Sequence, residues 1–112
     1  MSYDIAVWKG PLPQSDAEAA SLFALHIDHL DSAGNDIAES IHVLVSKLTD
    51  RWPEDSESSP WATSPLIGEA RGDFIYIPMT YSGAALGVIA IANEAARLGL
   101  ICFDPQDEVM LN

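Results

Sequence analysis

The sequence predicts an α+β fold with the element order β-α-α-β-β-α-β. Strand-like alternation occurs near the N-terminus and in 73–79, apolar residues recur at helical spacing in three segments, and a turn separates two strand-like runs. A hairpin between helical connections is typical of a mostly antiparallel sheet with helices packed on one face, close to a split βαβ arrangement. We expect one domain covering 1–112.

The chain is expected to begin with a strand and a helix. Residues 3–8 alternate and are rich in β-branched and aromatic types, and the glycine and prolines of 10–13 end the strand. Ser15–Glu18 has the spacing of a capping box, and apolar residues follow at helical intervals. The first helix is therefore expected from about Asp16 to Asp31.

A second helix and an acidic loop are expected next. After the break at 33–35, Asp36–Glu39 repeats the cap spacing, and the helix should end near Trp52 because a proline follows. The segment 53–64 is rich in Pro, Ser, Glu and Asp, which predicts a surface loop. Trp61 is the exception within this loop. Its side chain either packs back onto the rest of the domain or stays exposed for contact with a partner.

The second half should supply the remaining strands. Residues 66–70 and 73–79 read as a hairpin that turns at 71–72, and the second arm is the clearest strand in the chain. A last strand is expected over 100–103, and the tail 108–111 either adds a short edge strand or frays.

The third helix is expected over Gly83–Leu98, after a serine cap and before Gly99 as its left-handed stop. Its first half, 84–92, has almost no polar face, so a partner or a second copy would cover it. Two alternatives stay open. The residues Ala84, Gly87 and Ala90 are small and could simply face solvent, or 88–91 could be a buried strand.

Charge gives the strongest functional signal. The chain has 17 acidic and 5 basic residues, a formal charge of −12 and a pI of about 4.2. Such a field repels nucleic acid and anionic membranes and attracts cationic partners. The single cysteine, Cys102, lies in an apolar run, and the chain shows neither a signal peptide nor a membrane-spanning run. We therefore expect a cytoplasmic protein.

No residue pattern predicts catalysis. His26 and His29 lie three apart on the first helix, but no third ligand is spaced to complete a metal site with them. The serines lack a nucleophile elbow, and the glycines form no phosphate-binding loop. We expect no enzyme activity, no cofactor and no metal, and keep a small enzyme using both histidines and a carboxylate as a minor alternative.

The expected partner-binding residues are the acids of the loop and of the two helices. An aromatic side chain beside carboxylates is typical of a contact region for a basic partner, whereas a solvated face is the ordinary alternative. The loop supplies Glu54, Asp55, Glu57 and Trp61, and the helices supply Asp28, Asp31, Asp36 and Glu39.

Four segments carry a resemblance that spans nearly the whole chain. Ser2–Trp8, Ser59–Trp61, Pro65–Gly68 and Cys102–Gln106 resemble a family of small acidic bacterial proteins without assigned chemistry. In size and charge the chain is also similar to immunity proteins of contact-dependent growth inhibition and other polymorphic toxin systems. That likeness implies a protein that binds and neutralises a cognate toxin domain, often a basic nuclease. The main alternative is a structural or regulatory domain that homodimerises through the third helix.

Overall fold

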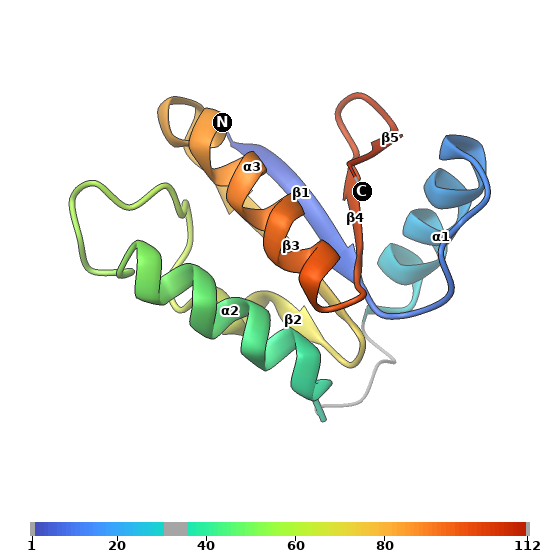
Figure 1. Cartoon of the computed structure of the whole chain (residues 1–112), viewed down its shortest axis with the longest axis horizontal. Coiled ribbons are helices and arrows are strands. Elements are labelled where there is room, and N and C mark those ends of the chain that lie inside the picture. The colour runs from blue at the N-terminus through green and yellow to red at the C-terminus, as the bar shows by residue number, and fades with distance from the viewer. Residues whose placement is uncertain (1, 31–35, 112) are drawn as a thin grey trace.

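A computed structural model describes residues 2–30 and 36–111 (Figure 1). In this part of the chain, five strands form one antiparallel sheet in the order β2-β3-β1-β4-β5. The strands are β1 (Tyr3–Trp8), β2 (Ala70–Arg71), β3 (Phe74–Met79), β4 (Ile101–Asp104) and β5 (Val109–Met110). The helices are α1 (Asp16–Asp28), α2 (Glu39–Arg51), α3 (Tyr81–Arg97) and a short 3-10 helix, η2 (Leu66–Glu69).

The centre of the sheet is a split β-α-β unit. Strands β3 and β4 each run antiparallel to β1, so they run parallel to one another with β1 between them. Helix α3 connects them. The α+β class and the antiparallel sheet of the sequence prediction are confirmed. The observed order differs in two places, because η2 replaces most of the first hairpin arm and the tail adds β5.

The helices cover both faces of the sheet, so the prediction that they pack on one face is wrong. Ile5 and Val7 of β1 belong to the core beneath α2 and α3, whereas Ala6 and Trp8 belong to the core beneath α1. Figure 1 shows α3 crossing in front of the sheet with α2 beside it, and α1 next to β4 and β5. Because both sets of β1 side chains are apolar, each face of the strand needs cover.

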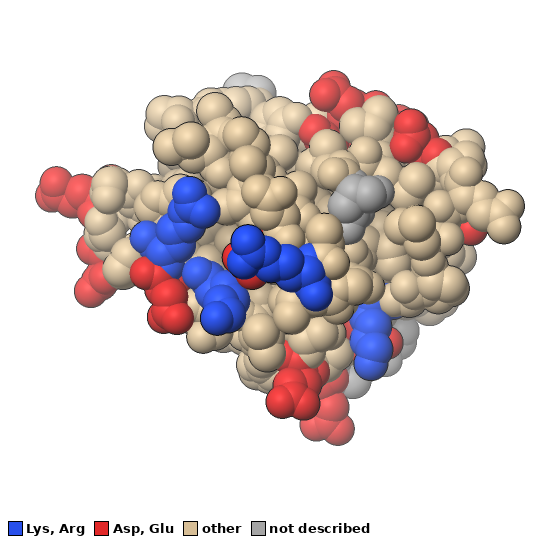
Figure 2. Space-filling model, in the orientation of Figure 1, with Lys and Arg blue, Asp and Glu red and all other residues tan. Residues whose placement is uncertain are grey.

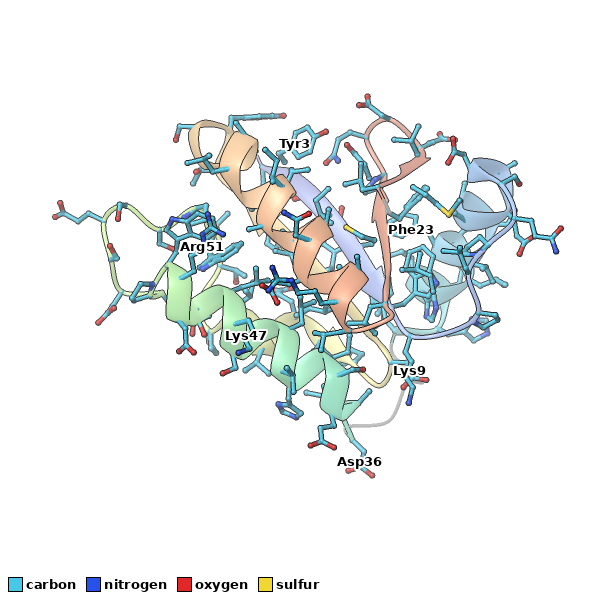
Figure 3. The ribbon with its side chains drawn as sticks, in the orientation of Figure 1. Tyr3, Lys9, Phe23, Asp36, Lys47 and Arg51 are labelled. Atoms are coloured by element: carbon cyan, nitrogen blue, oxygen red, sulfur yellow. The ribbon has the colours of Figure 1, made fainter. Side chains whose placement is uncertain are left out.

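Phe23 is the main side chain that joins α1 to the sheet. In the strand register Ala6 faces Tyr76 on one side and Phe103 on the other. The Phe23 ring lies 6.2 Å from the Tyr76 ring and 5.4 Å from the Phe103 ring, and it points from α1 toward the sheet (Figure 3). The small Ala6 side chain therefore leaves the space above β1 in which Phe23 packs.

Glycines let α3 lie close to β3 and to the loop at Pro60. A Cβ at Gly87 would lie 2.5 Å from Met79 Sδ, and a Cβ at Gly83 would lie 2.7 Å from Pro60 Cα. Neither distance is compatible with a side chain unless neighbouring atoms move. The segment is a helix throughout, so the alternative of a buried strand over 88–91 is wrong.

The outward face of α3 carries the large side chains. Leu86 is 65% exposed and Ile89 is 60% exposed. The residues that face the core are mostly small, namely Ala84, Gly87, Ala90, Ile91 and Ala95. The interpretation in which the small residues face solvent is therefore wrong.

No helix within the described residues is long and apolar enough to cross a bilayer.

Local signals predict the end of α3 better than its start. Gly99 has φ +71°, its N–H donates to Ala96 O, and Leu100 N–H donates to Ala95 O at 2.8 Å, which together form a Schellman motif. The predicted glycine stop is confirmed. The N-cap is Thr80, whose hydroxyl accepts from the third residue of the helix, and it replaces the expected serine two positions later.

The start of α2 depends on a tertiary contact. The helix begins at Glu39, its N-cap Ala38 offers no side-chain oxygen, and the expected cap at Asp36 lies outside it. Ala38 N–H instead donates to Gly72 O at 2.9 Å, in the turn between β2 and β3. Helix α1 likewise ends at Asp28, earlier than predicted. Asp31 and the predicted break at 33–35 lie outside the described residues.

Both edges of the sheet are short. At one edge β2 has two residues. Farther along the same side of β3, Ala62 N–H donates to Pro78 O at 2.9 Å, next to the isolated bridge between Trp61 and Met79. At the other edge β5 also has two residues, and Met110 N–H donates to a carboxylate oxygen of Asp16 in α1. Short edges with occupied donors discourage pairing with another chain.

Candidate binding surface

Trp61 is a core residue and not a surface anchor. The side chain is only 7% exposed, its Nε1–H donates to Trp52 O at 2.9 Å, and the two indole rings form an edge-to-face pair at 5.8 Å. The ring packs with the core beneath α2 and α3. The sequence left two alternatives for Trp61, and the structure shows the one in which the side chain packs back onto the protein. The side chain is therefore not available to a partner.

The three loop acids differ in their surroundings. Glu54 is half-buried, and its carboxylate accepts a hydrogen bond from Leu66 N–H, which ties the loop to the start of η2. Asp55 and Glu57 are exposed. Glu54 therefore helps to hold the loop in place, and only the other two carboxylates face solvent freely.

The exposed acids lie in separate places. Asp36 and Arg51 mark opposite ends of α2 in Figure 3, and the 13 residues of that helix span about 20 Å. Glu39 lies at the Asp36 end, whereas Asp55 and Glu57 follow the Arg51 end. The structure therefore does not bring the predicted acids together in one patch.

The acids at the Asp36 end have a neighbour that the sequence did not single out. The bond between Ala38 and Gly72 places the β2–β3 turn beside the start of α2, and exposed Asp73 follows Gly72 in that turn. We define the turn-side surface as Asp36, Glu39 and Asp73. Asp28 is also exposed, on α1, and Asp31 lies outside the described residues.

Three of the five basic residues lie on α2 and α3. Helix α2 supplies Lys47 and Arg51, α3 supplies Arg97, and Figure 2 shows Lys and Arg over these two helices with most Asp and Glu toward the rim. Among the residues that the structure describes, one ion pair involves a Lys or Arg side chain. Nη1 of Arg97 lies 3.5 Å from a carboxylate oxygen of Glu94. Most carboxylates therefore have no Lys or Arg partner within the described chain. Two basic residues nevertheless neighbour Asp73 of the turn-side surface, because Lys9 N–H donates to Asp73 O at 2.9 Å and Arg71 precedes the same turn.

An open hollow lies between α1 and the β2–β3 hairpin. This hollow, the α1 groove, has a volume of about 480 Å³, within the range of ligand pockets. Its lining residues are Phe23, Ile27, Leu30, Glu69, Arg71 and Tyr76. A second hollow of about 350 Å³ shares Leu30 and Arg71 with it and reaches Asp73 of the turn-side surface.

Sequence reasoning missed the α1 groove. Phe23, Ile27 and Leu30 follow the helical spacing of a core stripe, and that spacing does not reveal where the sheet ends beneath the helix. Ile27 is in fact 38% exposed. The groove lies beside the sheet edge, where β2 has only two residues.

The two charged residues of the α1 groove bond to neutral groups. The Glu69 carboxylate accepts from the Thr63 hydroxyl at 3.2 Å. Arg71 Nη1 donates to Gly68 O at 2.8 Å and to Ala70 O at 2.7 Å. Glu69 and Arg71 form no ion pair with one another.

His26 of α1 and its C-cap residue His29 line the second hollow. The His26 ring stacks on Phe74 at 5.0 Å and lies 5.4 Å from Trp8, and burial lowers its pKa while nearby Asp73 partly opposes the shift. His29 Nδ1 lies 2.7 Å from Leu25 O. Within the described ranges no three His, Cys, Asp or Glu side chains are grouped so that they could hold a metal ion.

A buried carboxylate organises the opposite end of β1. Asp104 is only 3% exposed, and its carboxylate accepts from the Tyr3 hydroxyl, Gln106 N–H and Gln106 Nε2, the last at 2.6 Å. Gln106 also pairs with both main-chain groups of Asp4. The carboxylate therefore fixes the β4–β5 connection against β1.

Two tyrosines next to carboxylates are hard to ionise. The hydrogen bond to Asp104, with burial, raises the pKa of Tyr3 to about 12, and burial with the hydrogen bond to Asp4 raises the pKa of Tyr76 to about 12. The ordinary value is 10.0, so the unfolded chain loses these protons first. Their contribution to stability is present below pH 10 and lost as the pH rises through 12.

We therefore expect the free energy of unfolding to fall between pH 10 and 12, as measured by urea denaturation. In Tyr76→Phe the free energy of unfolding should fall less steeply, because the variant has one less group to ionise on unfolding. Tyr3→Phe should show the same smaller fall. A fall of equal steepness in both variants and the unchanged protein would contradict the expectation.

Comparisons with family models, with curated proteins and with solved structures found no match to this chain.

Proposed function

We propose that this chain is a non-enzymatic immunity protein that binds and neutralises a basic, nuclease-type toxin domain in the cytoplasm. One observation carries the proposal: an exposed carboxylate without an ion pair, Asp73, lines a hollow that shares Leu30 and Arg71 with the open, largely apolar α1 groove. Unneutralised charge attracts a cationic surface over long distances, and an apolar groove supplies the desolvated contact that charge alone lacks.

The turn-side surface is the better contact region of the two acidic areas. Asp73 borders the hollow that shares Leu30 and Arg71 with the α1 groove, and Asp36 and Glu39 lie at the adjacent start of α2. The loop acids Asp55 and Glu57 have no such neighbour, because Trp61 is buried in the core. We therefore place the partner at the turn side of α2 and assign the loop acids to long-range attraction.

Binding of this kind would inhibit a nuclease by competition. The lysines and arginines with which a nuclease holds phosphates would pair with carboxylates instead. The net charge of −12 would speed the encounter, and a side chain buried in the α1 groove would slow dissociation.

A matched pair of triple variants tests the contact region. The variant Asp36→Asn/Glu39→Gln/Asp73→Asn should weaken binding to a toxin domain encoded by the neighbouring reading frame about tenfold, mainly through faster dissociation. The control Glu18→Gln/Asp55→Asn/Glu57→Gln changes net charge equally, at exposed positions elsewhere. It should mainly slow association, an effect that added salt removes. Absent binding, or equal dissociation rates in the two variants, would contradict the proposal.

The second candidate function is homodimerisation through α3. It is favoured by the exposure of Leu86 and Ile89, neighbours on the outward face of that helix. Sedimentation over a range of protein concentrations distinguishes the two functions. A tight dimer that Leu86→Ser dissociates would favour this alternative, and a monomer at all concentrations would exclude it.

A further inference from the structure

We propose that the α1 groove is the receptor for one arginine side chain of the cationic partner, with the Glu69 carboxylate as acceptor of its guanidinium group. The inference rests on the proposed function and specifies how the partner is held. It follows from the side chains that line the groove, from the hydrogen bonding of the Glu69 carboxylate and from the position of Arg71.

The walls suit a long side chain with an apolar stem and a planar head. The rings of Phe23 and Tyr76 are stacked, with centroids 6.2 Å apart and planes at 25°, and Ile27 and Leu30 line the helix side. Arginine packs its methylene groups along apolar surface and stacks its guanidinium on aromatic rings. A lysine ammonium is more strongly hydrated and does not stack in this way.

Glu69 is the acceptor that the groove provides. Its carboxylate is half-buried, and its one hydrogen bond to a described residue comes from the neutral Thr63 hydroxyl. A carboxylate has about four lone-pair positions and can accept two parallel N–H bonds from a guanidinium. Most of its capacity is therefore available to a cation that enters the groove.

Arg71 limits the affinity of the groove for a cation. Its guanidinium is held at the hairpin edge by the Gly68 and Ala70 carbonyls, and it leaves Glu69 unpaired. It nevertheless places positive charge beside the incoming arginine, which opposes binding. Removal of Arg71 should therefore strengthen the binding of a cationic probe, whereas removal of the Glu69 charge should weaken it.

The test is a titration of the full chain with N-acetyl-arginine methylamide, followed by ¹H–¹⁵N NMR. Saturable shifts are expected at the α1 groove, with the norleucine and lysine analogues binding more weakly. Glu69→Gln, which keeps an oxygen for Thr63, should weaken the arginine probe about three- to fivefold. Arg71→Gln should strengthen it. The control Glu57→Gln carries the same charge change in the loop and should alter affinity less than twofold.

Several results would overturn the proposal. Shifts spread over the acidic surface, or equal effects of Glu69→Gln and Glu57→Gln, would show general attraction and no receptor. Equal affinity for the norleucine analogue would show a purely apolar groove, and equal affinity for the lysine analogue would remove the assignment to arginine.

The two proposals can fail separately. If the toxin domain binds Glu69→Gln as tightly as the unchanged protein, the groove assignment is wrong and the proposed function stands. If the arginine probe occupies the groove but no toxin domain binds, the groove assignment stands and the proposed function is wrong.

Discussion

Replacement of Trp61 by alanine is expected to lower the free energy of unfolding by about 3–5 kcal/mol. The indole is almost fully buried, pairs edge-to-face with Trp52, and belongs to a strand-like bridge with Met79 at the edge of β3. Truncation would leave a cavity and remove the donor to the Trp52 carbonyl. Urea denaturation followed by circular dichroism measures the loss.

The variant Trp61→Phe separates packing from hydrogen bonding. It keeps an aromatic ring but lacks the N–H group, so it should cost less than the alanine variant, about 1–2 kcal/mol. If Trp61→Ala left stability unchanged and abolished partner binding, Trp61 would be a contact residue and its core assignment would be wrong. We expect instead that Trp61→Ala lowers stability, and that partner binding falls only in proportion to the fraction of protein that is unfolded.

Replacement of Asp104 by alanine should cost about 3 kcal/mol, because several donors that bond to this buried carboxylate would lose their acceptor. These donors are the Tyr3 hydroxyl, the Gln106 side-chain amide and two main-chain N–H groups. Asp104→Asn retains one oxygen of similar position and should cost about 1 kcal/mol. Thermal and urea denaturation at neutral pH provide the comparison.

Asp107→Ala is the matched control, since Asp107 follows closely in the chain but is exposed. It should change stability by less than about 0.5 kcal/mol. In Asp104→Asn the pKa of Tyr3 should also fall toward 10.0, because the hydrogen bond to a carboxylate is its largest cause. Equal stability losses at positions 104 and 107 would contradict the central role of the buried carboxylate.

The elements with strong local signals are those that the sequence predicts well. The second hairpin arm became β3, the alternating N-terminal segment became β1, and Gly99 ends α3 in the predicted conformation. In each case a short-range property determines the outcome, either alternation of side chains or the freedom of glycine at positive φ. Such properties are visible without knowledge of distant residues.

The features that could not be predicted depend on distant contacts. Helix α2 starts where Ala38 meets the turn at Gly72, which lies far along the chain. Trp61 folds back against Trp52, whose carbonyl accepts its Nε1–H and whose ring packs on it, while its main chain forms a bridge with Met79. The α1 groove is formed by α1 and a hairpin that begins about forty residues later.

The short edges of the sheet determine how any partner can be recognised. Within the described residues, the two-residue edge strands and the Met110 N–H occupied by Asp16 leave only short edges for β-augmentation. We therefore expect recognition to rely on side chains, which can be exchanged one at a time. Reversal of a charge on this protein together with its counterpart on the partner could then create an orthogonal pair, which main-chain pairing would not allow.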